Sequence, residues 1–208
     1  MKLLIFGATG GTGRLLVGQA LETGHMVSAF VRTPDKLKID HPNLKFVRGD
    51  VLDLPTVETV VKGQEAVLST IGAGDKRSKI RTEGTRKIIK AMEREGVRRF
   101  ISLSTIGIGD SRDLLPWHYK YFLVPLLLRH AFADHEGQEK QIEQSNLDWT
   151  IVRAAALTDG SLTEAYRHGF TSADKPIEAK ISRADVADFM LKQLTDDLYL
   201  HKAPCISY

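Results

Sequence analysis

The sequence contains almost no cysteine: Cys205 is the only one in 208 residues. A single cysteine excludes an intrachain disulfide and a cysteine-rich metal site, and it is typical of proteins from a reducing compartment. We therefore expect no metal site and a cytoplasmic location.

A strong charge of one sign and a long hydrophobic run are also missing. The 29 Lys and Arg residues oppose 26 Asp and Glu residues, and the resulting net charge of +3 is too small to indicate a nucleic-acid partner. The most apolar stretch, residues 114–128, contains Trp117–Lys120 and two prolines, and falls short of the roughly 20 apolar residues of a membrane span. Glycines interrupt the apolar run after Phe6, so we do not expect a signal peptide. We expect a soluble protein with neither nucleic acid nor membrane as a partner.

Short apolar runs alternate with helical patterns along the chain. The pattern predicts strands at 2–6, 26–31, 44–48, 66–70, 99–103, 149–153, near 177–181 and at 205–208. It predicts helices at 11–23, 56–62, 83–95, about 114–146, and after Ser182 with Asp185 behind it. Such alternation is typical of right-handed βαβ units with a parallel sheet. We expect one doubly wound, Rossmann-like α/β domain over residues 1–208, with substrate loops at about 105–135 and 154–176.

A glycine-rich loop, Gly7-Ala8-Thr9-Gly10-Gly11-Thr12-Gly13, separates the first predicted strand from the first predicted helix. Gly7 permits a sharp turn, Gly10 permits the backbone to approach a pyrophosphate, and Gly13 permits close packing of helix and strand. The N–H groups at the helix N-terminus would then face the phosphates. A plain turn between strand and helix is the alternative. We expect a dinucleotide to be held by Gly7, Thr9, Gly10, Gly11, Thr12 and Gly13.

The end of the second predicted strand favours NADPH over NADH. Enzymes that use NAD usually carry an acidic residue there, but this strand ends in Arg32, and Lys36 follows four residues later. A guanidinium pairs with a 2′-phosphate through two hydrogen bonds. The alternative is that Arg32 is an ordinary solvated arginine.

The loop Gly-Ala-Thr-Gly-x-Thr-Gly resembles the cofactor loop of the atypical short-chain dehydrogenase/reductases of the NAD(P)H-binding family. Segments such as Leu157–Asp159 and Leu194–Tyr199 are similar in order and spacing to those of its biliverdin-IX-beta reductase (flavin reductase) group. The resemblance implies that Asp50 and Val51 flank the adenine and that Ser104 or Thr105 supplies an active-site hydroxyl. We place the other cofactor contacts at Thr70, Ile71, Gly72, Leu103, Arg153, Ala155 and Ala156. A helix-entry role for Asp50 and a loop-initiating role for Ser104 and Thr105 are the alternatives.

The best-known catalytic pair of short-chain dehydrogenases, Tyr-x-x-x-Lys, is missing. None of the five tyrosines has a lysine four residues later, and Ala131 and His135 stand where the pair is expected. The biliverdin-IX-beta reductase group also lacks the pair. Chemistry between alcohols and ketones, which needs a phenol to carry the proton, is therefore disfavoured. His135 is a candidate proton source because the pKa of histidine ordinarily lies near neutrality; a purely structural histidine is the alternative.

These features predict an NADPH-dependent reductase that transfers hydride to a flavin or a biliverdin-like linear tetrapyrrole, with FMN or FAD as substrate rather than prosthetic group. The acceptor site is expected in two segments. The first is the aromatic segment Leu114–Phe122, for which a buried helix or an interface with a second chain is the alternative. The second is the cationic segment Asp75–Arg81, for which a solvated charged face is the alternative. We expect a monomer or weak homodimer.

Two other functions stay open. A non-catalytic NADP(H) sensor would tolerate loss of the catalytic pair. A sugar-nucleotide epimerase-like enzyme is disfavoured because the segment after Arg153 is short for a separate sugar-binding lobe. Separately, Arg153–Ala156 stands where the biliverdin-IX-beta reductase group has a proline pair and a histidine, so this chain lacks that histidine and its substrate can differ.

If Arg32 pairs with a 2′-phosphate, the protein will bind NADPH about tenfold more tightly than NADH, the usual effect of one charged hydrogen-bonded contact. Titrations that give both dissociation constants test this. Equal constants for the two cofactors would refute the role assigned to Arg32.

Overall fold

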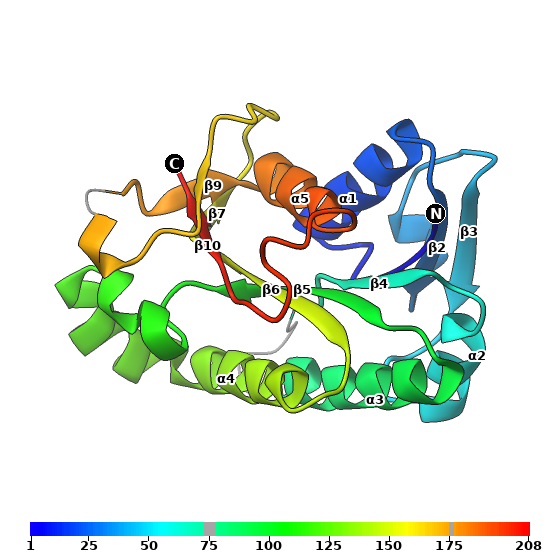
Figure 1. Ribbon diagram of the computed structural model, residues 1–208, viewed down its shortest axis with the longest axis horizontal. Helices are drawn as coiled ribbons and strands as arrows, with labels where there is room; N and C mark the ends of the chain where they lie inside the picture. The colour runs from blue at the N-terminus through cyan, green and yellow to red at the C-terminus, as the bar shows by residue number, and fades with distance from the viewer. Residues whose placement is uncertain (73–77, 175–176) are drawn as a thin grey trace.

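A computed structural model of the protein describes residues 1–72, 78–174 and 177–208 (Figure 1). Its centre is an eight-stranded sheet in the order β3-β2-β1-β4-β5-β6-β10-β8, in which every neighbouring pair is parallel except β10 and β8. The strands are β1 (Lys2–Phe6), β2 (Met26–Val31), β3 (Leu44–Arg48), β4 (Ala66–Ser69), β5 (Arg99–Thr105), β6 (Asp148–Ala154), β8 (Arg167–His168) and β10 (Cys205–Ser207). The strand order reverses between β1 and β4, as in a doubly wound fold.

Helices cover both faces of the sheet. Helices α1 (Gly11–Glu22) and α5 (Arg183–Lys192) lie on one face, and α2 (Leu54–Val61), α3 (Ile80–Glu95) and α4 (Arg129–Glu143) lie on the other (Figure 1). Successive side chains of a strand point to opposite faces, so Leu3 and Ile5 join the core under α1 while Leu4 and Phe6 join the second core. The doubly wound Rossmann-like fold expected from the sequence is confirmed.

The segment of helical character expected at about residues 114–146 is largely helical, but it is not one continuous α-helix. The chain forms a 3-10 turn at Gly109–Leu114, a π-helix at Tyr119–Leu128, and α4 after that. Pro125 lies inside the π-helix and has no N–H to donate, which disfavours regular α-helical hydrogen bonding there. A small parallel pair, β7 (Ala156–Thr158) and β9 (Lys180–Ser182), and 3-10 turns at Pro34–Lys36 and Ser172–Asp174 complete the described elements.

Helix α3 begins at Ile80, three residues before the expected start, because its cap comes from α4. The buried carboxylate of Asp134 accepts hydrogen bonds from the backbone N–H groups of Arg81 (3.1 Å) and Thr82 (2.9 Å). It also accepts one from the Thr82 hydroxyl (2.8 Å). A carboxylate at a helix N-terminus is stabilising, so Asp134 fixes α4 against α3. The helix ends at Gly96 in the left-handed conformation (φ +71°), as expected.

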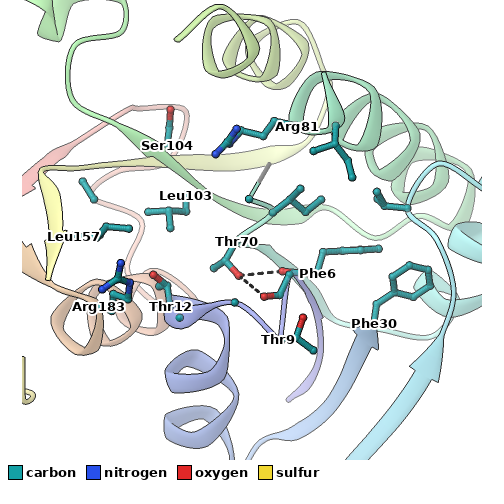
Figure 2. Close-up of a pocket in the computed structure, with 18 of the residues that line it drawn as sticks. Phe6, Thr9, Thr12, Phe30, Thr70, Arg81, Leu103, Ser104, Leu157 and Arg183 are labelled. Carbon is teal, nitrogen blue, oxygen red and sulfur yellow. Dashed lines mark hydrogen bonds between the residues drawn. The ribbon is translucent and has the colours of Figure 1, made fainter. Parts of the chain in front are cut away.

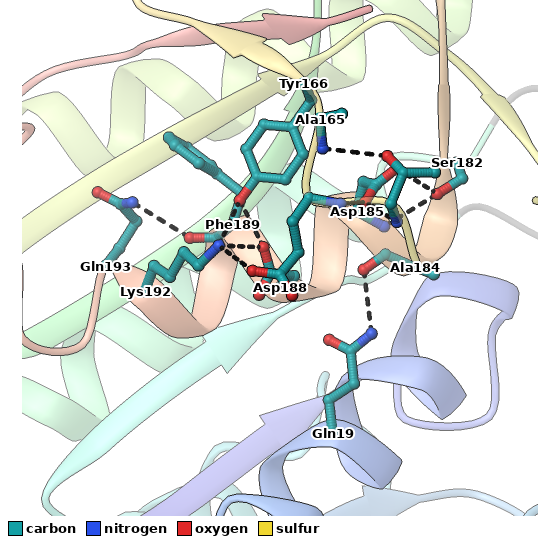
Figure 3. Close-up of polar contacts among 12 residues, drawn as sticks. Gln19, Ala165, Tyr166, Ser182, Ala184, Asp185, Asp188, Phe189, Lys192 and Gln193 are labelled. Carbon is teal, nitrogen blue, oxygen red and sulfur yellow. Dashed lines mark hydrogen bonds and ion pairs between the residues drawn. The ribbon is translucent and has the colours of Figure 1, made fainter. Parts of the chain in front are cut away.

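Helix α5 is fixed by a second buried carboxylate, Asp185 (Figure 3). The predicted cap is confirmed, since Ser182 Oγ accepts from the Asp185 backbone N–H at 3.0 Å. The carboxylate accepts from Ser182 (2.9 Å), from Tyr208 (2.6 Å), and from two N–H groups and a hydroxyl of Thr163–Glu164. Burial acts to raise the pKa of Asp185, but these hydrogen bonds outweigh it and hold the pKa below its usual value. Asp185 thereby joins α5, the 161–166 loop and the C-terminal residue.

We expect Asp185→Ala to lower the free energy of unfolding by about 3 kcal/mol at pH 7, because several buried donors lose their acceptor. Because the pKa of Asp185 is lower in the native state than in the unfolded state, where it is about 4, the ionised carboxylate stabilises the native state above about pH 4. This stabilisation is lost as the pH falls through the native pKa, so the difference in stability between wild type and variant will shrink below about pH 4. Urea denaturation at several pH values measures both effects. The control Asp159→Ala, at an exposed ion pair, will change stability by less than about 0.5 kcal/mol. An equal loss for both variants would contradict this role of Asp185.

Candidate functional site

A cavity of about 760 Å³ runs along the carboxyl edge of the sheet, where ligands bind in doubly wound folds (Figure 2). It brings together most of the residues predicted from the sequence. These are Gly7, Thr9, Gly10, Gly11, Thr12, Arg32, Lys36, Asp50, Val51, Thr70, Ile71, Gly72, Leu103, Ser104, Thr105, His135, Ala155 and Ala156. Gly13 and Arg153 are the two predicted residues that do not line it.

The glycine loop holds β1, β4 and α1 in close contact. Gly7 has φ +77°, and a Cβ there would overlap the carbonyl oxygen of Thr70. A Cβ on Gly13 would overlap the carbonyl oxygen of Gly7, so Gly13 serves helix packing rather than the cavity wall. The Thr70 hydroxyl donates to the carbonyls of Phe6 (3.2 Å) and Gly7 (3.3 Å), which ties the end of β4 to the loop (Figure 2).

The N-terminus of α1 faces the cavity without a side-chain cap. Gly10 is the N-cap residue, it has no side chain to accept from the helix, and the first turn contains no acidic residue. The free N–H groups and the positive end of the helix dipole therefore favour an anionic group.

Arg183 adds a positive charge to this end of the cavity. It comes from the first position of α5, and a Cβ on Gly11 would lie 2.8 Å from its Cδ and Nε atoms. Its guanidinium pairs with the exposed Asp159 at 2.5 Å. The sequence analysis missed Arg183, since nothing local marks a residue so far along the chain as a neighbour of the loop.

Ser104 and Arg81 lie across the cavity from Thr9 of the glycine loop (Figure 2), and His135 also lines the cavity. The Ser104 hydroxyl donates to Oε1 of Glu139 at 2.5 Å, and its oxygen is 3.3 Å from Nδ1 of His135. Burial, with a smaller effect of the Arg81 charge, lowers the pKa of His135 to about 3. This lowered pKa favours a neutral ring at pH 7 over a histidine that titrates near neutrality.

The guanidinium of Arg153 is buried behind Ser104. Its Nη2 pairs with Oε2 of Glu139 at 2.7 Å, and its Nη1 pairs with Asp110. Burial raises the pKa of Glu139 even though Arg153 and Ser104 both act to lower it. Sequence reasoning missed Glu139, although its spacing of four from His135 places both residues on one face of α4.

The two segments expected to receive the acceptor have different outcomes. None of residues 114–122, all of which the structure describes, lines the cavity, so the structure does not support this segment as part of the acceptor site. Residues 75–77 of the cationic segment, with Ala73 and Gly74 of the preceding loop, lie outside the described residues. Arg81, the last cation of that segment, does line the cavity, and Asp134 holds it through an Nη1–Oδ2 contact of 3.4 Å.

No tyrosine reaches this cavity. All five tyrosines belong to the described residues, and none of them is part of the wall. The loss of the catalytic Tyr and Lys in the sequence is therefore not made good by a tyrosine from another part of the described chain.

A model of the NAD(P)H-binding family matches residues 7–197. The chain belongs to the NAD(P)H-binding family. A relative from Bacillus subtilis, described as an uncharacterized sugar epimerase, is 28% identical over 205 residues, which cover 94% of this chain and 89% of the relative.

Solved structures share the fold over the whole chain. The oxidoreductase YlbE from Lactococcus lactis has a TM-score of 0.84 and 25% identity, and the match covers 100% of this chain and 90% of that one. ChuY, an anaerobilin reductase from Escherichia coli O157:H7, has a TM-score of 0.82 and 23% identity, with 100% and 97% covered. A short-chain dehydrogenase/reductase from Veillonella parvula, solved with NADP, has a TM-score of 0.82 and 20% identity, with 100% and 94% covered. The protein therefore has an NAD(P)H-binding, oxidoreductase-like fold.

None of the helices in residues 1–72, 78–174 and 177–208 has the length and apolar character of a membrane span.

Because burial lowers the pKa of His135 to about 3, its ring will stay neutral from pH 5 to pH 8. An NMR titration of the histidine ring protons measures this, with the resonance assigned by its loss in His135→Asn. A midpoint between pH 5 and 8 for that resonance would contradict the burial of the ring.

Proposed function

We propose that the protein is a cytoplasmic, NADPH-dependent reductase that transfers hydride to a planar conjugated acceptor, a flavin or a linear tetrapyrrole. The observation that carries the proposal is the composition of one cavity. Its wall contains a glycine loop at a helix N-terminus, cations just after β2, and the Ser104 hydroxyl at the end of β5, which the buried Glu139 of α4 orients from behind; none of the tyrosines lines it.

The residues at one end of the cavity fit a phosphorylated dinucleotide. The uncapped N-terminus of α1 and Arg183 would hold the pyrophosphate. Arg32 and Lys36 line the cavity at the end of β2 and would hold the 2′-phosphate. Asp50 and Val51 line the same region, and one Asp50 oxygen already accepts from the Leu52 N–H at 2.9 Å, so the other oxygen would meet the adenine amino group.

The other end of the cavity orients groups rather than supplying an acid. When bound, NADPH would supply the hydride, and a conjugated acceptor would accept it without a protein phenol. The Ser104 hydroxyl already donates its hydrogen bond to Glu139. Its oxygen can therefore only accept a hydrogen bond from a group in the cavity, such as a carboxamide N–H or a water molecule. Glu139 is fixed in turn by Arg153. A neutral His135 and the apolar Leu103, Ala155 and Leu157 leave solvent as the source of the final proton.

Three relatives support parts of this proposal. The oxidoreductase YlbE supports a redox function, ChuY, described as an anaerobilin reductase, supports a bilin as the acceptor, and the Veillonella protein supports NADP as the cofactor. The Bacillus relative is described as a sugar epimerase, so the test below also includes epimerisation of a sugar nucleotide as an alternative activity.

The test follows NADPH absorbance with FMN, FAD, biliverdin and a quinone as separate acceptors. We expect oxidation well above background with at least one flavin or biliverdin. Ser104→Ala will lower kcat about tenfold or more while the dissociation constant of NADPH changes little, because the hydroxyl orients the reacting end. Ser145→Ala, at the far end of α4, serves as the matched control with unchanged kcat.

Binding of NADPH without oxidation by any acceptor would contradict the reductase and favour a dinucleotide sensor. Epimerisation of a sugar nucleotide without net NADPH consumption would contradict it in favour of the epimerase.

A further inference from the structure

Residues 117–128, here called the apolar arm, expose an unusual group of large apolar side chains. Trp117, Tyr121, Leu126 and Leu127 are 63–72% exposed, Phe122 is 56% exposed and Tyr119 is 37% exposed. Elsewhere in the described chain the large exposed apolar residues are scattered along the sequence, as on most proteins, whereas these six lie together. The arm belongs to the green coils at the left edge of Figure 1. A clustered patch of this kind indicates an interaction surface.

The base of the arm is fixed to the body of the protein. Leu114 is buried, and Leu115 and Phe132 pack around Gly107, where a Cβ would lie within 3 Å of either side chain. Between them, no residue of the π-helix Tyr119–Leu128 is buried. A helix that is apolar on all sides is typically enclosed by protein or by lipid. The body of this protein covers the arm only in part: Leu123, Val124 and Leu128 are half-buried, and the other large apolar side chains are exposed.

The charge around the arm identifies the kind of partner. Residues 114–133 contain no Asp or Glu, while they contain Lys120, Arg129 and two histidines. The nearest acid, Asp113, pairs with Lys120 at 2.6 Å at the base of the arm. Asp113 balances Lys120, but residues 114–133 contain no acid to balance Arg129. Two copies related by a twofold axis through the arm would bring these arginines toward each other, which disfavours self-association.

Aromatic residues, leucines and cations together are the composition of segments that lie in a lipid interface. Trp and Tyr prefer the level of the headgroups, leucines enter the acyl chains, and Lys and Arg are attracted by anionic lipids. The π-helix has 10 residues, too few to cross the roughly 30 Å of hydrocarbon.

From these observations we propose that the apolar arm inserts into the interface of a membrane that contains anionic phospholipids, and attaches the protein to it peripherally. It departs from the expectation of no membrane partner, which rested on the absence of a membrane-spanning run and of a signal peptide in the sequence. This proposal rests on the arm and is independent of the proposed reductase function.

Vesicle flotation of the full-length protein tests the proposal. We expect the protein to float with phosphatidylcholine vesicles containing about a third phosphatidylglycerol, to float far less with pure phosphatidylcholine, and to be released in part by high salt. The Leu126→Asp/Leu127→Asp variant will lose binding by about tenfold or more, since two inserted leucines are replaced by charges. Leu198→Asp is the matched control, because Leu198 is a single exposed leucine outside the arm, and this variant will float like the wild type.

Thermal melts of each variant establish that it is folded, and sedimentation of the wild type and the double variant reports self-association. A folded wild type that does not float with anionic vesicles overturns the proposal. A dimer that Leu126→Asp/Leu127→Asp dissociates, with no flotation, overturns it in favour of a second copy as the partner. Equal flotation of the double variant and the Leu198→Asp control also overturns it, because binding would then occur elsewhere.

Discussion

The close approach of three backbone segments at the glycine loop is the constraint on which the site depends. A side chain at Gly7 or Gly13 would overlap the carbonyl of Thr70 or of Gly7, so β4, β1 and α1 meet at this distance only if both positions are glycine. This contact aims the uncapped end of α1 into the cavity. It also places the loop beside the ends of β2 and β5, from which Arg32 and Ser104 reach the same cavity.

The opposite end of the cavity depends on buried charge. Arg153 is always charged, and its guanidinium needs the carboxylate of Glu139 because an unpaired ion in the core is very costly. Glu139 in turn accepts the hydrogen bond of the Ser104 hydroxyl, so the orientation of that hydroxyl is fixed by a residue behind the cavity wall. The two carboxylates Asp134 and Glu139 have separate tasks on α4: the first fixes the helix to α3, and the second orients the site.

Features determined by local sequence were predicted well. The glycine loop, the strands β1 to β6, the Ser182 cap and the left-handed Gly96 each follow from residues close together in the sequence, whereas the short strands β7 and β8 were not predicted. Features determined by distant residues were not. The start of α3 depends on Asp134, Arg183 reaches the loop from α5, and Arg153 leaves its expected position beside the cofactor because Glu139 attracts it. The shift in the His135 pKa depends on its burial, which no local pattern reveals.

The central claim is that the cavity at the carboxyl edge binds NADPH with its phosphates on the loop of α1. Hydrogen–deuterium exchange measured with and without NADPH tests it most directly. The structure predicts slower exchange for the backbone N–H groups of residues 9–14, where the uncapped helix end meets the phosphates, and for residues 31–36. Unchanged exchange at residues 9–14 with NADPH bound, or protection confined to the opposite edge of the sheet, would contradict it.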